Sequence, residues 1–117
     1  MVIETLTQRS DFLKAARAKR DARPGFVLQA RRRGEGEPDG ALIRVGFTCS
    51  KKVGNAVARN RAKRRLRALA REVLPRAGVP GFDYVLIGRV ETTATRDFAE
   101  MTADMEKALK RLHGGKT

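Results

Sequence analysis

The chain has 117 residues, of which 26 are Lys or Arg and 13 are Asp or Glu, so its formal net charge is +13. This length allows one domain with a modest core, and an apolar fraction of 41% is that of a folded chain rather than a disordered one. A single cysteine excludes an internal disulfide and fits a reducing compartment, and no apolar run approaches the roughly 20 residues that cross a bilayer. We therefore expect a cytoplasmic protein whose partner is a polyanion, above all a phosphate backbone.

The first half of the chain predicts one helix followed by two strands. Ser10 and Asp11 could cap a helix that continues through Arg20 and stops before Pro24. The segment FVLQA, residues 26–30, reads as a short strand, and the Gly- and Pro-rich residues 31–40 read as a mobile hairpin connection. Residues 41–50 alternate in polarity. One face of this strand should therefore carry Ile43, Val45, Phe47 and Cys49, and the other Arg44, Gly46, Thr48 and Ser50.

The second half predicts a long helix, a strand and a last helix. Asn55 is a plausible N-cap, after a turn over residues 51–55, for a helix from Ala56 to about Leu74. DYVLIGRV, residues 83–90, is a strongly apolar strand. A last helix, with Thr95 near its start, carries an apolar stripe of Phe98, Met101, Met105, Ala108, Leu109 and Leu112. Residues 113–117 should form a flexible tail, and the whole chain, 1–117, a single α+β domain with helices against a small sheet.

Residues 51–71 contain nine cations and no Asp or Glu. On a helical wheel the arc that must face the sheet holds Ala58, Ala62, Leu66, Leu69 and Val73, and the opposite arc holds Asn60, Lys63, Arg64, Arg67 and Arg71. An ordinary solvated helix mixes charge signs, whereas this one has no acidic partner before Glu72. Arg also outnumbers Lys, which favours bidentate contacts with phosphate. The pattern predicts a helix that binds nucleic acid.

The run K-K-x-G-x-A-V-x-R-N-R-x-K-R-x-x-R, residues 51–67, resembles the signature of the bacterial ribonuclease P protein family. The N-terminal helix with Phe12 and the segments FVLQA, RVGFTCS and DYVLIGR occur in that family's order, so the resemblance spans residues 9–112. It implies a two-layer sandwich with three helices and a mixed sheet of about four strands, in the order α-β-β-β-α-β-α. It also implies a left-handed βαβ crossover through the basic helix. The strand that the pattern itself does not show would lie near Arg23 and Pro24.

The resemblance further implies an accessory, noncatalytic subunit of a tRNA-processing ribonucleoprotein endonuclease. The partners would be ribonuclease P RNA, with one protein monomer per RNA, and precursor tRNA, and the RNA would perform the hydrolysis with Mg²⁺. Docking on that RNA would use Arg59, Asn60, Arg61, Lys63, Arg64, Arg67 and Arg71. The open sheet face and the first helix would form a cleft for the single-stranded 5′ leader, lined by Phe12, Gln29, Arg44, Thr48, Lys51 and Lys52. Some members carry aromatics where this chain has Ala16 and Gln29, so charge and hydrogen bonding should replace part of the stacking.

Other interpretations make different predictions. Catalysis by the protein alone would need clustered carboxylates or a His or Lys pair, whereas the chain has one histidine, His113, and Cys49 reads as an apolar filler. A DNA reader would show two short helices joined by a turn, or a dimer-forming segment. A structural RNA binder would share the charge but lack a groove for a single strand. The sheet face with Gln29, Arg44 and Thr48 distinguishes a structural RNA binder from a leader-binding subunit. A helix or loop over this face would remove the basis for leader binding. Phe12 is either a core anchor or a stacking platform.

Overall fold

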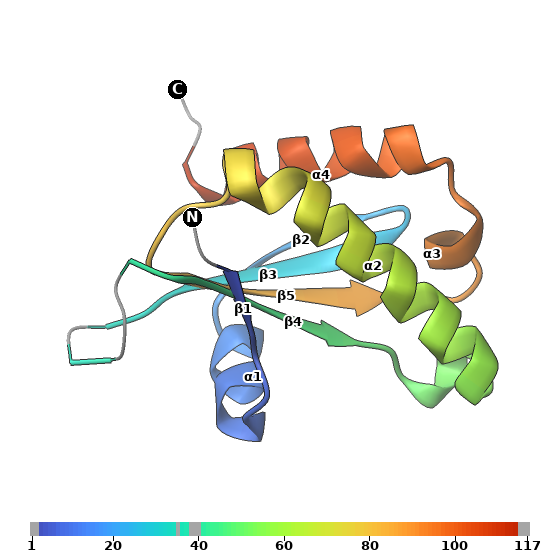
Figure 1. Ribbon diagram of the computed structural model, residues 1–117, viewed down its shortest axis with the longest axis horizontal. Helices are drawn as coiled ribbons and strands as arrows, with labels where there is room; N and C mark the ends of the chain where they lie inside the picture. The colour runs from blue at the N-terminus through green and yellow to red at the C-terminus, as the bar shows by residue number, and fades with distance from the viewer. Residues whose placement is uncertain (1–2, 35, 38–40, 115–117) are drawn as a thin grey trace.

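The computed structural model describes residues 3–34, 36–37 and 41–114 and shows one mixed sheet with helices on both faces (Figure 1). The strands are β1 (Ile3–Thr5), β2 (Lys19–Arg23), β3 (Phe26–Arg32), β4 (Ile43–Thr48) and β5 (Phe82–Gly88), in the sheet order β1-β4-β5-β3-β2. The helices are α1 (Arg9–Ala16), α2 (Ala56–Ala77), α3 (Thr92–Thr95) and α4 (Phe98–Leu112), with a 3₁₀ turn at Lys51–Val53. The α+β class is confirmed, with five strands and four helices in place of about four and three.

The first helix is shorter than its pattern predicts, because the chain turns into a strand. Helix α1 ends at Ala16, and Lys19–Arg23 pairs antiparallel with β3. This is the additional strand that the resemblance places near Arg23. Its sequence, KRDAR, has no β-branched or aromatic residue, so local propensity favours a helix. The hairpin with β3 prevails because Pro24 and Gly25 form a two-residue loop and the register satisfies the backbone groups.

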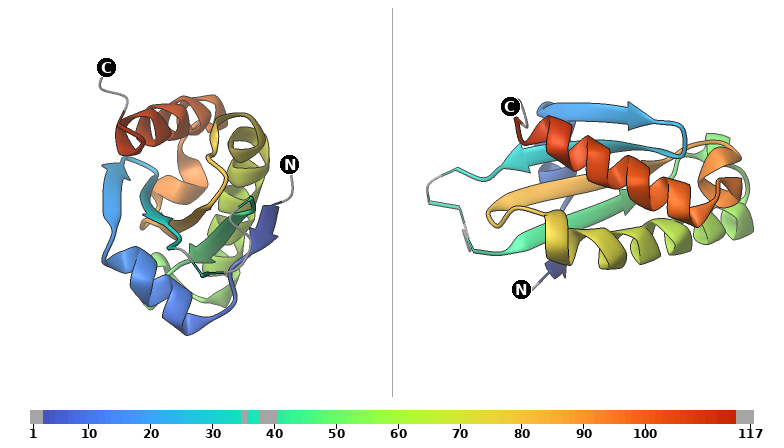
Figure 2. Two further views of the ribbon diagram at one scale, coloured as in Figure 1. Left: turned by 90° about the vertical axis from the view of Figure 1, so that its left-hand side faces the viewer. Right: turned by 90° about the horizontal axis from the view of Figure 1, so that it is seen from above.

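The hairpin predicted between β3 and β4 is wrong, because β5 lies between these two strands. Val85 of β5 pairs with Gln29 of antiparallel β3 on one side and with Gly46 of parallel β4 on the other. Residues 35 and 38–40 of the connection lie outside the described residues. In the right-hand view of Figure 2 helices α2 and α4 face the viewer, β4 and β5 both run to the right, and β5 lies above β4. That arrangement makes the crossover through α2 left-handed, as the resemblance implies and against the usual hand.

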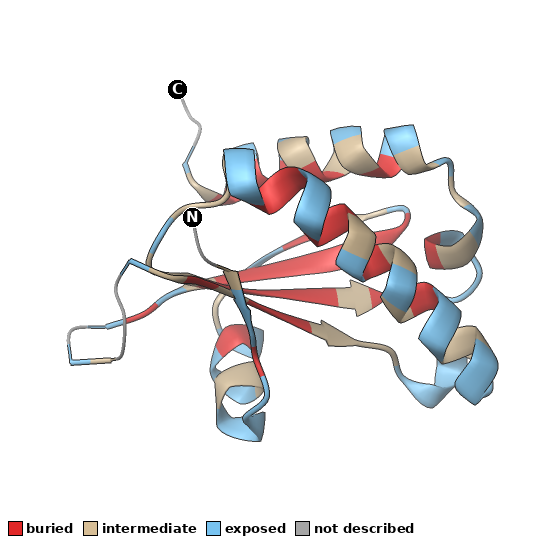
Figure 3. Ribbon diagram, viewed as in Figure 1, coloured by how far each residue is buried: buried red, intermediate tan, exposed pale blue. Residues whose placement is uncertain are grey.

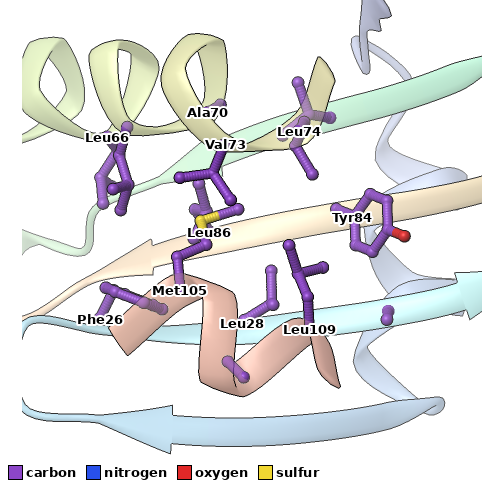
Figure 4. Packing of buried hydrophobic residues seen from close by; sticks show 14 of the residues in the cluster. Phe26, Leu28, Leu66, Ala70, Val73, Leu74, Tyr84, Leu86, Met105 and Leu109 are labelled. Carbon is purple, nitrogen blue, oxygen red and sulfur yellow. The ribbon is translucent and has the colours of Figure 1, made fainter. Parts of the chain in front are cut away.

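The main core lies between the sheet and the layer of α2 and α4 (Figures 3 and 4). The expected faces of both helices are confirmed: α2 buries Ala62, Leu66, Leu69 and Val73, and α4 buries Met101, Met105, Ala108, Leu109 and Leu112. Ala58 and Phe98 are only half-buried. Helix α4 starts after an Asp97 N-cap, because Thr95 belongs to the separate short helix α3. His113 is not part of a free tail, since its Nε2 lies 2.6 Å from the Tyr84 hydroxyl; residues 115–117 lie outside the described residues.

Candidate nucleic-acid interface

The first turn of α2 is built by two caps. The Asn55 side chain accepts a hydrogen bond from the Ala58 amide at 2.9 Å, which confirms the predicted N-cap. Ser50 caps the preceding 3₁₀ turn by accepting from the Lys52 amide at 3.3 Å. Gly54 connects the two turns at φ 142°, where a Cβ would also lie 2.8 Å from the Cβ of Ala58. The turn thereby sets the exposed side chains of Lys51 and Lys52 beside the positive end of the α2 dipole.

The outer face of α2 is a continuous cationic surface, here called the α2 face. Its members are the residues that the sequence assigns to RNA docking: Arg59, Asn60, Arg61, Lys63, Arg64, Arg67 and Arg71. All are exposed except Arg59 and Lys63, which are half-buried. In Figure 3 the ribbon of α2 alternates between the exposed, intermediate and buried colours, as expected for a helix with one face on the core. Within the described residues, no carboxylate forms an ion pair with any of them. The face therefore presents six cations whose mutual repulsion is not offset within the described part of the chain.

One arginine of the same run has a structural role instead. The Arg65 guanidinium donates to the carbonyls of Ala94 at 3.1 Å and Arg96 at 2.5 Å, and it lies over the Phe98 ring at 5.7 Å. These contacts fasten the segment between α3 and α4 to α2 and satisfy carbonyl oxygens that the short α3 leaves open. Arg65 is therefore not part of the α2 face, and it is also absent from the residues that the sequence assigns to RNA docking.

On the other side of the sheet, α1 covers part of the face proposed to hold a single strand (Figure 1). Phe12 lies directly over Gly46, where a Cβ would come within 2.5 Å of the ring, and it packs with a small cluster of Leu6, Ala15 and Val85. Gln29, next to Val85 in the register, is only 6% exposed. Gln29 is thus not available as a leader contact in this structure, which corrects the sequence expectation. Phe12 is a packing anchor that remains half-exposed.

Arg44 is engaged within the protein, by a partner that sequence reasoning missed. Its Nε and Nη2 donate to the two carboxylate oxygens of Asp83 at 2.8 and 2.7 Å, and Asp11 lies 3.5 Å away. Asp83 is fully buried and also accepts from Arg33 at 2.6 Å. Such a carboxylate requires partners, so Arg44 and Arg33 serve to neutralise it. Arg44 therefore belongs to an internal ion-pair network and is not a free cation in the cleft.

The open part of this sheet face lies at the carboxyl end of β4, beyond α1. Thr48 is half-exposed there beside Ile87, and it lines a shallow depression of about 400 Å³ together with Thr7, Arg9, Phe12 and Phe47. Lys51 and Lys52 follow Thr48 directly along the chain. A groove therefore persists on this face, without Gln29 and Arg44 as free contacts. Thr48 and Phe12 line it, Lys51 and Lys52 are exposed next to it in the chain, and Arg9 is an addition that the sequence did not single out.

Two other kinds of site are absent from the described residues. No group of three or more His, Cys, Asp or Glu side chains there is arranged to hold a metal ion. Among the described helices, none combines the length and apolarity needed to span a bilayer. Burial raises the pKa of the Cys49 thiol, which keeps it protonated at neutral pH and fits the role of apolar filler.

The fold is a mixed sheet with a left-handed crossover, and the crossover helix carries guanidinium groups that no described carboxylate pairs with. These features define a class of small α+β proteins suited to binding a polyanion. The chain belongs to the ribonuclease P protein family, since the family model described as Ribonuclease P matches residues 3–113. This membership confirms the resemblance of residues 51–67 and places the chain in tRNA processing.

Relatives and solved structures agree with this assignment. The chain is 61% identical over 114 residues to the ribonuclease P protein component of Ruegeria pomeroyi, covering 97% of this chain and 90% of the relative. It is 46% identical to that of Erythrobacter litoralis, over 95% of this chain and 87% of the relative. The RNase P protein from Thermotoga maritima has a TM-score of 0.72 at 30% identity, covering 92% of this chain and 96% of that one. The Staphylococcus aureus RNase P protein has a TM-score of 0.69 at 25% identity, covering 92% and 93%.

Proposed function

We propose that this chain is the RNA-binding accessory subunit of ribonuclease P, which removes the 5′ leader of precursor tRNA. The α2 face would dock on the catalytic RNA, and the groove at Thr48 would hold the single-stranded leader. The observation that carries the proposal is that the α2 face is exposed and no described carboxylate pairs with its cations. An external polyanion would offset such a surface, and an RNA helix supplies a dense array of phosphates.

The groove would bind the leader mainly through charge. Lys51 and Lys52 lie at the positive end of α2, where phosphate oxygens are favoured, and Arg9 adds a cation at the start of α1. The half-exposed ring of Phe12 offers one stacking surface. Recognition should therefore depend on an unpaired strand of suitable length more than on its base sequence.

The chemistry would belong to the RNA subunit and its Mg²⁺ ions. The protein's part is to reduce phosphate repulsion where RNA and substrate meet, so that the complex assembles with less Mg²⁺. We expect one protein monomer for each RNA. A cleavage assay with precursor tRNA at low Mg²⁺, using the protein, a bacterial ribonuclease P RNA or both, tests this division. We expect cleavage only from the combination, and cleavage by the protein alone would refute it.

The first prediction concerns the α2 face. The double variant Arg61→Ala/Arg64→Ala should bind ribonuclease P RNA more weakly, because two phosphate contacts are lost. The salt dependence should also become shallower, by about 0.7–0.9 log units per decade of salt for each lost contact. Filter binding over a range of salt concentrations measures both quantities. The matched control is Lys107→Ala/Lys110→Ala, which removes two exposed cations from α4. Equal slopes in the two double variants would contradict the assignment.

The second prediction concerns the groove. Lys51→Ala/Lys52→Ala should weaken binding of leader-bearing precursor tRNA by the assembled complex about tenfold, and Phe12→Leu should do so about fivefold, because a stacked base contributes about 1–3 kcal/mol. Mature tRNA has no leader and should bind equally well to each variant and to the unaltered protein. Titration of the assembled complex with both tRNAs gives the two dissociation constants. Parallel losses for the two substrates would reject the groove as the leader site.

A further inference from the structure

A pocket of about 560 Å³ opens at the other end of the sheet from Thr48, where β2 begins and β3 and α4 end. This volume is within the range of small-ligand sites, about 300–1,000 Å³. Its lining combines an aromatic wall of Phe82 and His113 with the cations Lys19 and Arg32. None of these four residues belongs to the α2 face or to the groove at Thr48.

The aromatic wall has a defined geometry. The rings of Phe82 and His113 meet edge to face, with centroids 4.4 Å apart and planes at 84°. The Tyr84 hydroxyl lies 2.6 Å from His113 Nε2 and accepts from the Val79 amide at 2.9 Å. This hydrogen bond to the hydroxyl holds the imidazole ring in place beside Phe82.

The charge states support this arrangement at neutral pH. Burial, and to a smaller extent the charge of Lys19, lowers the pKa of His113, so the ring is neutral. Burial raises the pKa of Tyr84 to about 12, so its hydroxyl stays protonated. A neutral His113 provides a flat ring beside Phe82 without adding a further positive charge to the pocket.

Two of the three cations that line the pocket are available for a ligand. Lys19 and Arg32 are both exposed, and no carboxylate in the described ranges forms an ion pair with either. Their neighbour Arg31 differs, because Glu37 accepts from it at 2.7 Å. Two uncompensated cations at one rim favour an anion, and the adjacent ring surface favours an unsaturated, flat group.

We infer that this pocket binds a nucleotide, with its phosphate on Lys19 and Arg32 and its base against Phe82 and His113. A bare anion would leave the aromatic wall unused, and an apolar ligand would leave the two cations unmatched. The nucleotide comes either from an RNA strand that crosses this end of the sheet or from the free pool. The inference does not require that the α2 face bind RNA.

Titrations of the ¹⁵N-labelled protein, monitored through amide chemical shifts in NMR spectra, test the inference. The three probes are adenosine 5′-monophosphate, inorganic phosphate and a single-stranded RNA of five nucleotides. We expect adenosine 5′-monophosphate to shift the amides of Lys19, Arg32 and Phe82, with at least tenfold higher affinity than phosphate. Lys19→Ala/Arg32→Ala should reduce that affinity at least tenfold, whereas the control Lys107→Ala/Lys110→Ala should leave it unchanged. Both pairs change exposed side chains, so folding is preserved.

The outcomes separate the possibilities. Shifts of the same amides with the RNA as well as the mononucleotide identify a strand as the source, and shifts with the mononucleotide alone identify a free nucleotide. Equal affinities for phosphate and adenosine 5′-monophosphate would overturn the inference, because the base would then contribute nothing. Shifts confined to α2, or no shifts at the pocket, would also overturn it. Loss of RNA binding in Arg61→Ala/Arg64→Ala would test the role of the α2 face and would leave the inference about this pocket unchanged.

Discussion

Substitution of Gly46 by Ala tests how α1 is held on the sheet. Gly46 is buried in β4, and a Cβ there would lie 2.5 Å from Cε1 and Cζ of Phe12 and 3.2 Å from the Cβ of Leu6. Carbon atoms pack at about 3.5–4.0 Å, so the ring must move by about an ångström. Gly46 does not have a positive φ, so the backbone itself accepts alanine. The cost is therefore one of overpacking, about 1–3 kcal/mol of unfolding free energy.

Urea unfolding of a double-mutant cycle isolates this contact. Phe12→Ala removes the ring that the added methyl group would meet, so in that background Gly46→Ala should cost less than about 0.5 kcal/mol. Because the displaced Phe12 lines the groove at Thr48, Gly46→Ala should also weaken binding of leader-bearing precursor tRNA. It should not change the salt slope for ribonuclease P RNA. The same penalty for Gly46→Ala in both backgrounds would refute the reasoning.

Two further predictions concern buried or paired carboxylates. Asp83→Asn removes the fully buried carboxylate that neutralises Arg33 and Arg44, and it should lower the unfolding free energy by about 3–5 kcal/mol. A loss below about 1 kcal/mol in urea unfolding would contradict this role. Hydrogen bonds from Arg31, and to a smaller extent from the Gly34 amide, lower the pKa of Glu37 to about 2. Ionised Glu37 therefore stabilises the fold fully above its ordinary pKa of 4.5, and this stabilisation is lost as the pH falls toward 2. Urea unfolding at pH 6 should show Glu37→Gln to be less stable than the unaltered protein, and at pH 2 this difference should be almost gone. A difference in unfolding free energy that does not change with pH would argue against the pairing.

Features set by neighbouring residues could be predicted from the sequence. The start of α2 at Ala56, its Asn55 cap and its buried arc of Leu66, Leu69 and Val73 all follow from local capping and a period of 3.6 residues. The concentration of cations on the opposite arc follows from the same geometry. The signature in residues 51–67 also indicates the family, and with it the left-handed crossover, which no local pattern indicates.

Features that depend on distant residues were decided only by the tertiary structure. The segment KRDAR becomes β2 because the edge of β3 is available to it. Strand β5 lies between β3 and β4 because its apolar run is buried on both faces of the sheet. Arg44 leaves the predicted cleft because Asp83, 39 residues away, is its partner. Arg65 of the cationic run donates instead to carbonyls about 30 residues away. Periodicity and capping act within a few residues of the chain, whereas strand pairing and ion pairing depend on which distant segments the fold brings together. For that reason the sequence by itself determined the cationic helix, and only the tertiary structure decided which of its charges, and which part of the sheet, remain free to bind.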